Sequence, residues 1–418
     1  FLYSHLKGKN PLALYRPMHT RFLKAIFTAS LLAVLPGKGL YAQSFNVDSA
    51  LSAMSIDEKI GQLFMVAAYS NKGEDHQAEL EKLVRQYHIG GVITMQGGPE
   101  RQKKLLHRLQ SAAAFPLLVG QDAEWGQAMR LDSTYKFPTS LTVGAAGGTM
   151  DAYDLGHALA DECSAVGVHM SFSPVLDVNT NPNNPIIGAR SFGSDPDLVN
   201  TLGVAVVKGI QENGVLACGK HFPGHGYTHQ DSHKTLPKVD RTLSELMEVE
   251  WVPFKGAIDA GVGAIMIAHL NIPSLEPSGK PTSLSRKVIK EILRDQWGYE
   301  GLIITDALNM KGAAAFAPPG ELELAAFAAG NDILLFPMDV PKATKAFQDA
   351  LATDKISFQS LDERVRRILV AKSNCRAYSD WLEAQKSANP TLLTSDHGSF
   401  ESEDLNQRVS FNLIRNAA

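Results

Sequence analysis

Eight short apolar runs, separated by stretches with helical periodicity, constrain the fold of this chain more than any other feature. The apolar runs are Gly61–Ala68, Gly91–Met95, Leu117–Gln121, Met170–Val178, Leu216–His221, Ala264–His269, Leu302–Asp306 and Ile333–Phe336. The helical patterns between them are Glu79–Tyr87, Arg101–Ala114, Tyr153–Val166, Pro196–Asn213, Ser244–Ala260, Ser285–Gln296 and Leu322–Ala328. This alternation predicts βαβ units and a parallel sheet, which is an α/β fold. Eight strands fit a (β/α)8 barrel, although a doubly wound open sheet has the same periodicity.

Polar residues at the ends of the predicted strands favour the barrel. They are Asp122, Asp177, Lys220, His221, His269 and Asp306. In a (β/α)8 barrel the C-terminal ends of all strands form one rim, and active sites lie there. We therefore expect a functional site at this rim.

The composition is that of a globular protein, with 44% hydrophobic and 20% charged residues. The net charge of -4 gives no indication of a nucleic-acid partner or of attraction to an anionic membrane. The three cysteines, Cys163, Cys218 and Cys375, lie far apart without CxxC spacing. We expect free, buried thiols and no disulfide framework.

Residues 1–42 are typical of an upstream segment followed by a secretory signal peptide. Met18 is a better start than Phe1, and the basic residues after it precede an apolar run at 25–35 and small residues up to Ala42. An N-terminal anchor or an ordinary helix is the alternative, but the run is short for a bilayer. We expect an exported bacterial protein, periplasmic or extracellular, without stable membrane insertion after signal removal.

The remaining chain is divided at residue 375. Residues 46–375 form the predicted barrel, which the amphipathic helix Asp362–Lys372 closes. Residues 376–418 are predicted to be a linker and the truncated start of a C-terminal domain, because 376–405 are polar and without a strong period. We expect the protein to be a monomer.

The segment Lys220–His233 carries four histidines, a lysine and an aspartate. One Pro and two Gly force it into a loop. Asp231 can accept a hydrogen bond from the imidazole of His233, which would make a general acid/base that works near neutral pH. A surface-loop histidine is the alternative interpretation.

Histidines recur every four residues in the same segment, at 221, 225, 229 and 233. On a helix they would share one face and suggest a metal site, but Pro223, Gly224 and Gly226 argue against a helix. A motif such as HExxH is absent. We expect no metal and no cofactor, and a loop-shaping role for His225.

Asp306 ends an apolar strand in GLIITDALNM. Burying a carboxylate there is costly unless it is paired or used. It could cap the following helix, or it could serve as the nucleophile or electrostatic stabiliser of a retaining glycosidase.

Further charged groups at the predicted rim suit a ligand rich in hydroxyls, because they offer directional and bidentate hydrogen bonds. The residues are Asp122, Glu124, Arg130, Arg190, Lys220 and His221. Trp125 could stack on a sugar face or could pack in the core. These residues predict a carbohydrate ligand.

The motifs KHFPGHG and DSH, with RSFG upstream and ITDAL downstream, resemble the catalytic domain of family 3 glycoside hydrolases. More narrowly, they resemble the bacterial β-N-acetylglucosaminidase branch, over about residues 50–375 in the family's order. The resemblance implies a (β/α)8 barrel and a retaining mechanism without metal. It implies that Asp306 is the nucleophile and that His233 is the acid/base with Asp231 as its dyad partner.

The resemblance also assigns a set of residues to the non-reducing-end sugar: Asp122, Arg130, Arg190, Lys220 and His221. One departure is DAEWGQAMR, which stands where the family commonly has DQEGG and puts the leaving-group specificity in doubt. The final LNQRVSFNLIRN resembles the start of the family's second, α/β sandwich domain.

The implied function is a retaining exo-β-N-acetylglucosaminidase that removes terminal β-linked GlcNAc from peptidoglycan fragments. A β-N-acetylglucosaminide phosphorylase or a β-glucosidase with the same site remains an alternative. A metal-dependent hydrolase and a non-catalytic sugar-binding protein are further alternatives.

Overall fold

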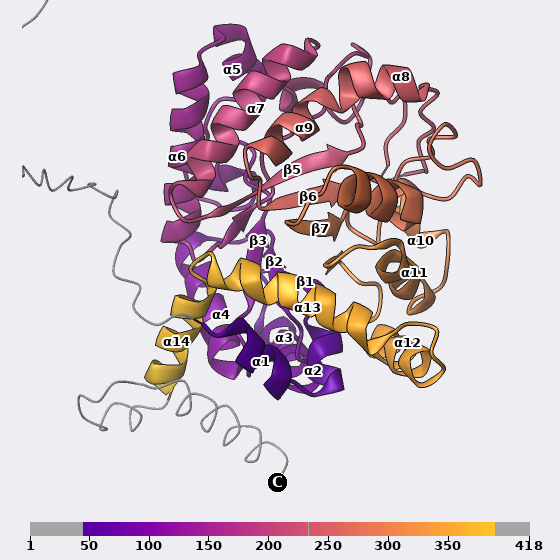
Figure 1. The fold of residues 1–418 in the computed structure, drawn as a ribbon. Coiled ribbons are helices and arrows are strands. Elements are labelled where there is room, and N and C mark those ends of the chain that lie inside the picture. The colour runs from indigo at the N-terminus through magenta and orange to yellow at the C-terminus, as the bar shows by residue number, and fades with distance from the viewer. Residues whose placement is uncertain (1–44, 233, 389–418) are drawn as a thin grey trace, which may run out of the picture. The chain divides into compact units, whose positions relative to one another are not determined.

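The computed structural model describes residues 45–232 and 234–388, and eight parallel strands lie at its centre (Figure 1). The strands are β1 Phe64–Ala68, β2 Gly91–Thr94, β3 Leu118–Gln121, β4 Met170–Ser171, β5 Leu216–Phe222, β6 Ala264–Ile267, β7 Leu302–Thr305 and β8 Leu334–Leu335. From β1 to β7 each strand pairs with the next in chain order, and β1 also pairs with β8. The eight predicted strands are all present.

The barrel closes between β7 and β8. Ile304 and Ile333 form a parallel bridge, and the Thr305 N–H donates to the Ile333 carbonyl at 3.1 Å. A doubly wound sheet would leave two open edges and would not follow this order of strands. The prediction of a (β/α)8 barrel is confirmed.

Helices cover the outside of the strands (Figure 1). They include α3 Glu74–Tyr87, α4 Pro99–Ala112, α6 Thr149–Ala165, α7 Pro196–Gln211, α9 Val252–Asp259, the π-helix η5 Lys287–Gln296, α11 Glu321–Ala329, α12 Val340–Ala352 and α13 Phe358–Ser373. Before α9 the chain forms a short α8, Leu243–Glu245, and a π-helical turn, η3 Leu246–Glu250. Each predicted helical segment is helical in the structure.

Helix α12 was not predicted. The smaller helices were not predicted either. They are α1 Val47–Ala53, α2 Ile56–Gly61, α5 Ser140–Ala146 and α10 Lys311–Ala314. Each is at most seven residues long, so each contains too few turns to display a helical period.

Strand β4 is shorter than the predicted run Met170–Val178. Pro174 interrupts the ladder because proline has no N–H to donate, and a parallel bridge resumes between Val175 and Lys220. Phe172, Leu176 and Val178 are nevertheless fully buried. The apolar pattern therefore reports burial correctly and overstates the length of the regular strand.

Within the described residues, no helix is both long and apolar enough to cross a membrane. All three cysteines are free, and Cys163 and Cys218 are buried as expected. Residues 1–44 and 389–418 lie outside the described part, so the signal peptide and the start of a further domain stay predictions.

Residues 377–388 differ from the predicted linker, because they form helix α14, Ala377–Ala388. Its buried positions are Ala377, Trp381 and Ala384, and the indole Nε1 of Trp381 donates to the Ala113 carbonyl at 2.9 Å. His169 Nε2 lies 3.1 Å from Asp380 Oδ2. Two of the three buried positions are alanine, which explains why the sequence showed no strong hydrophobic period.

We predict that Trp381→Ala lowers the free energy of unfolding by about 3 kcal/mol, because it removes a buried aromatic ring and a hydrogen bond. Urea denaturation at neutral pH measures the change. Phe358→Ala is the control, since Phe358 is 52% exposed and Trp381 only 8%. Equal effects of the two substitutions would mean that α14 does not contribute to the stability of the barrel.

Candidate active site at the barrel rim

A buried lysine joins two carboxylates at the C-terminal ends of β3 and β5. Lys220 Nζ lies 2.8 Å from Asp122 Oδ1 and 2.8 Å from Glu124 Oε1. Arg130 approaches the other oxygen of Asp122, with Nη2 and Oδ2 2.5 Å apart. Three of the predicted sugar-binding residues, Asp122, Arg130 and Lys220, are thus brought together.

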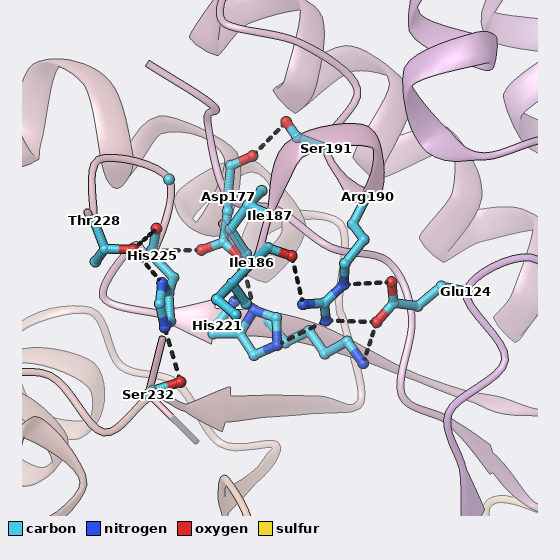
Figure 2. Close-up of polar contacts among 12 residues, drawn as sticks. Glu124, Asp177, Ile186, Ile187, Arg190, Ser191, His221, His225, Thr228 and Ser232 are labelled. Carbon is cyan, nitrogen blue, oxygen red and sulfur yellow. Dashed lines mark hydrogen bonds and ion pairs between the residues drawn. The ribbon is translucent and has the colours of Figure 1, made fainter. Parts of the chain in front are cut away.

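Arg190 reaches the same cluster from the long connection after β4 (Figure 2). Its Nε and Nη2 donate to the two oxygens of Glu124, at 2.8 and 2.7 Å, in the bidentate geometry that fits a guanidinium to a carboxylate. Its Nη1 donates to the Ile186 carbonyl at 3.2 Å. Glu124 therefore links Arg190 to Lys220.

Opposite charges determine the protonation states in this cluster. Burial alone would raise the pKa of Asp122 and of Glu124, but the nearby Lys220, with Arg130 and Arg190, outweighs it. The pKa of Asp122 lies far below its usual range, and that of Glu124 is lowered to about 2. Burial would lower the pKa of Lys220, whereas the two carboxylates raise it. All three groups are therefore charged at neutral pH.

His221 is held between Asp177 and Arg190 (Figure 2). Arg190 Nη2 lies 3.2 Å from His221 Nε2, and a guanidinium can only donate. Nε2 therefore carries the lone pair, and Nδ1 donates its proton to Asp177 Oδ2 at 2.7 Å. These contacts orient the imidazole at the rim, with Nδ1 towards Asp177 and Nε2 towards Arg190.

The end of β5 is irregular, and this explains how adjacent residues serve one site. The register against β6 shifts between Gly219 and Phe222. In a regular strand Lys220 and His221 would point to opposite faces, but an irregular register can redirect side chains next to a functional site. Here both side chains end in the same chain of polar contacts.

The loop after β5 is built around His225 (Figure 2). Its N–H donates to Asp177 Oδ1 at 2.7 Å, its Nδ1 lies 2.8 Å from Thr228 Oγ1, and its Nε2 lies 3.1 Å from Ser232 Oγ. Burial lowers the pKa of His225 to about 4. His225 is therefore neutral, and its hydrogen bonds to Asp177, Thr228 and Ser232 hold the loop in shape. This agrees with the loop-shaping role expected from the sequence.

The proposed dyad is described only in part. Asp231 is partly exposed, and its Oδ2 lies 3.7 Å from Lys234 Nζ. His233 lies outside the described residues. The pairing of Asp231 with His233 therefore stays a prediction.

Asp306 follows β7, and its N–H donates to the Ile267 carbonyl at the end of β6 at 2.9 Å. The carboxylate is partly exposed, and Oδ1 accepts from the Ala307 N–H at 2.8 Å. Burial would raise the pKa of Asp306, but His269, Lys220 and the Ala307 N–H keep it below its usual value. Asp306 is therefore an ionised carboxylate with access to the rim.

The alternative role of Asp306 as a helix cap is not what the structure shows. Helix α10 begins at Lys311, and the residue at its cap position is Met310. In the described part of the chain, the Ala307 N–H gives the only hydrogen bond to the Asp306 carboxylate. One carboxylate oxygen thus remains available for chemistry, whereas both oxygens of Asp122 and of Glu124 are engaged.

The sequence interpretation missed two connecting residues. The sequence predicts Glu124 only as one of the charged rim groups and Asp177 only as a polar strand end. Both are almost completely buried acids, with 3% and 0% exposure. The sequence pattern that could have revealed them is an acidic residue among apolar ones, without an oppositely charged residue close by in the sequence. If such an acid is buried, it needs a partner from elsewhere in the fold.

Within residues 45–232 and 234–388, no group of three or more His, Cys, Asp or Glu side chains could hold a metal ion. Trp125 is partly exposed, and the Lys136 ammonium lies 5.9 Å from the centre of its ring.

We predict that Glu124→Gln destabilises the protein in a pH-dependent way. The folded pKa is below the unfolded value of about 4.5, so ionised Glu124 contributes stability above pH 4.5 and loses it as the pH falls towards 2. The variant should be less stable by on the order of 3 kcal/mol at pH 7. The difference should shrink as the pH falls from 4.5 towards 2.

Urea denaturation of the variant and of the parent protein at pH 7 and pH 3 tests this expectation. Glu100→Gln is the control, because the Glu100 side chain is 76% exposed and pairs only with Lys103 in the described structure. A destabilisation that is the same at both pH values would show that the charge of Glu124 is not the cause.

The chain resembles known proteins over most of its length. The family model described as glycosyl hydrolase family 3 N terminal domain matches residues 55–371. A relative named beta-hexosaminidase A, from Pseudoalteromonas piscicida, is 34% identical over 358 residues, which cover 78% of this chain and 59% of that protein. The chain thus spans less than two thirds of the length of this relative.

Solved structures give the same result. A glycoside hydrolase family 3 beta-N-acetylglucosaminidase from Paenibacillus sp. has a TM-score of 0.71 and 34% identity, and the match covers 85% of this chain and 68% of that one. A beta-glucoside phosphorylase, BglX, has a TM-score of 0.76 and 29% identity, and the match covers 81% and 63%. With the family model matched across the barrel and its rim, this chain belongs to glycosyl hydrolase family 3.

Proposed function

We propose that this protein is a retaining exo-β-N-acetylglucosaminidase, which removes terminal β-linked N-acetylglucosamine. The observation that carries the proposal is Asp306, an ionised carboxylate at the barrel rim with one oxygen not engaged by a described residue. The names of the beta-hexosaminidase relative and of the beta-N-acetylglucosaminidase structure support the choice of sugar.

In the first step, the free oxygen of Asp306 attacks the anomeric carbon. The lowered pKa of Asp306 keeps it anionic, so it also stabilises the positive charge that develops on the sugar ring. His233, paired with Asp231, protonates the departing glycosidic oxygen. The product of this step is a covalent glycosyl-enzyme and a free alcohol.

In the second step, neutral His233 takes a proton from water, and the resulting nucleophile attacks the anomeric carbon from the face that the leaving group vacated. The bond to Asp306 breaks, and the sugar leaves with its original configuration. Two inversions at one carbon account for retention. These two steps need no metal ion.

The charged cluster at the rim would bind the terminal sugar. Lys220, Arg130 and Arg190 offer donors and Asp122 offers acceptors to sugar hydroxyls, while their mutual ion pairs hold them in position before the sugar arrives. Such preorganisation lowers the entropy cost of binding. His221 adds the lone pair of Nε2 as a further acceptor when Arg190 turns to the ligand.

We further propose that the natural substrates are peptidoglycan fragments and that the protein is exported. The support is the resemblance to the bacterial branch of the family together with the leader-like residues 18–42. Incubation of the purified protein with GlcNAc-anhydromuropeptides and with chitobiose, followed by product analysis, would show which substrate it prefers.

We predict that Asp306→Asn lowers kcat/KM for an aryl β-N-acetylglucosaminide by at least about a thousandfold, or about 4 kcal/mol, because the covalent nucleophile is lost. Steady-state kinetics measure this effect. Asp349→Asn is the control, since Asp349 is 62% exposed on α12 and pairs with Lys345. Activity of the Asp306 variant within tenfold of the parent would refute the nucleophile assignment.

Phosphorolysis of the same substrates is a second candidate, favoured by the similarity to the beta-glucoside phosphorylase. An imidazole acid/base would repel phosphate less than a carboxylate would. We expect free N-acetylglucosamine as the product both with and without phosphate. Accumulation of a sugar 1-phosphate in phosphate buffer would instead assign phosphorolysis, and faster release of glucose than of N-acetylglucosamine would assign a glucosidase.

A further inference from the structure

Ser232 lies in the loop after β5 and is held by two hydrogen bonds, one to His225 within the loop and one to Gly312 in α10. Its side chain is buried, with 2% exposure, and its Oγ lies 3.1 Å from His225 Nε2. Its carbonyl accepts a hydrogen bond from the Gly312 N–H at 3.3 Å. Ser232 stands in the sequence between Asp231 and His233, the two members of the proposed acid/base dyad.

The direction of the side-chain hydrogen bond follows from its neighbours. Thr228 Oγ1 donates its one proton to the His225 carbonyl at 3.0 Å, so it can only accept from His225 Nδ1. Nδ1 therefore carries the proton of the neutral ring, and Nε2 carries the lone pair. The hydroxyl of Ser232 is then the donor to Nε2, and Figure 2 shows this contact as a dashed line.

Gly312 connects this contact to the segment of the candidate nucleophile. It lies in α10, six positions after Asp306. A Cβ atom at Gly312 would be 3.2 Å from the Ser232 carbonyl oxygen, 3.1 Å from the Thr235 carbonyl oxygen and 3.2 Å from His269 Cβ. Glycine is thus needed for the loop to approach this closely, and any side chain would push the two segments apart by a few tenths of an ångström.

We propose that Ser232 is a positioning residue, which sets the distance between the acid/base loop and the nucleophile through its hydrogen bonds to His225 and Gly312. This inference rests on the proposed function. It predicts a defect specific to proton donation, because loosening this contact moves the loop relative to Asp306 and leaves the sugar-binding cluster of Lys220 in place.

The test compares two substrates that differ in their need for an acid. A 2,4-dinitrophenyl β-N-acetylglucosaminide has a leaving group that departs without protonation, whereas a 4-methoxyphenyl glycoside needs a proton. For Ser232→Ala we expect kcat/KM to fall about tenfold or more with the methoxyphenyl substrate and less than about threefold with the dinitrophenyl one, since general acid catalysis contributes about 10²–10⁴-fold.

A second variant tests the same contact from the opposite side. Gly312→Ala keeps every hydrogen-bonding group and introduces a better helix former, so the fold is preserved. It should give the same leaving-group-dependent loss as Ser232→Ala. Gly73→Ala is the matched control, because a Cβ there meets nothing within 4 Å, and both substrates should react as with the parent protein.

Ser285→Ala controls for the loss of a buried serine hydroxyl elsewhere. Ser285 is 1% exposed, and its hydroxyl donates to Glu276 Oε2 at 2.7 Å. It should change stability without changing the ratio of kcat/KM for the two substrates. Urea denaturation of all four variants verifies that each is folded under the assay conditions.

Equal losses on both substrates, or no loss on either, in the Ser232 and Gly312 variants would overturn the positioning role. His233→Ala separates this result from a failure of the proposed function. If that variant loses no more activity on the methoxyphenyl than on the dinitrophenyl substrate, the acid/base assignment fails and the positioning role fails with it. A leaving-group-dependent loss in all three variants supports both.

Discussion

The ammonium group of Lys220, shared between Asp122 and Glu124, is the interaction on which the site depends. It joins the ends of β3 and β5, and through Glu124 it reaches Arg190 in the connection after β4. Removing one partner from such a buried group leaves an uncompensated charge, which typically costs about 3–5 kcal/mol. The three segments at this side of the barrel are therefore fixed by one cluster of charges.

This cluster contributes little net free energy to the stability of the barrel, because the cost of taking several ions out of water offsets much of their mutual attraction. Asp332, at the opposite ends of the strands, shows the alternative: Arg294 and Arg367 pair with it, and the Ile303 N–H donates to it. These contacts of Asp332 help to hold the barrel closed between β7 and β8. At the rim, by contrast, no salt bridge from the described residues reaches the Asp306 carboxylate, and its only hydrogen bond from them comes from the Ala307 N–H. This asymmetry points to ligand binding.

Much of the fold could be predicted from the sequence, because strands buried on both faces give continuous apolar runs and the helices between them have a clear period. The apolar run at Met170–Val178 located β4 but could not reveal that Pro174 would interrupt its ladder. The prediction of a linker over α14 is wrong because the buried face of this helix consists mainly of alanine, which gives no strong hydrophobic period. Local chemistry also predicted rim positions for Asp306, Lys220 and His221, but the pairings through Glu124 and Asp177 join residues far apart in the chain. Such pairings depend on tertiary structure that no local pattern encodes.

The two halves of the proposed chemistry are held by different means. Asp306 is placed by the backbone, through the bond from its N–H to Ile267 at the end of β6, so its position follows from the register of the barrel itself. The part of the loop after β5 that holds His225 and Ser232 is ordered instead by hydrogen bonds of buried groups. The Asp177 carboxylate accepts from the His225 N–H, and the Ser232 hydroxyl donates to the His225 ring. Asp177 also orients His221, so one buried carboxylate links sugar recognition to the order of the loop. A change at Asp177 would therefore disturb both functions together, whereas a change at Ser232 would disturb only the second.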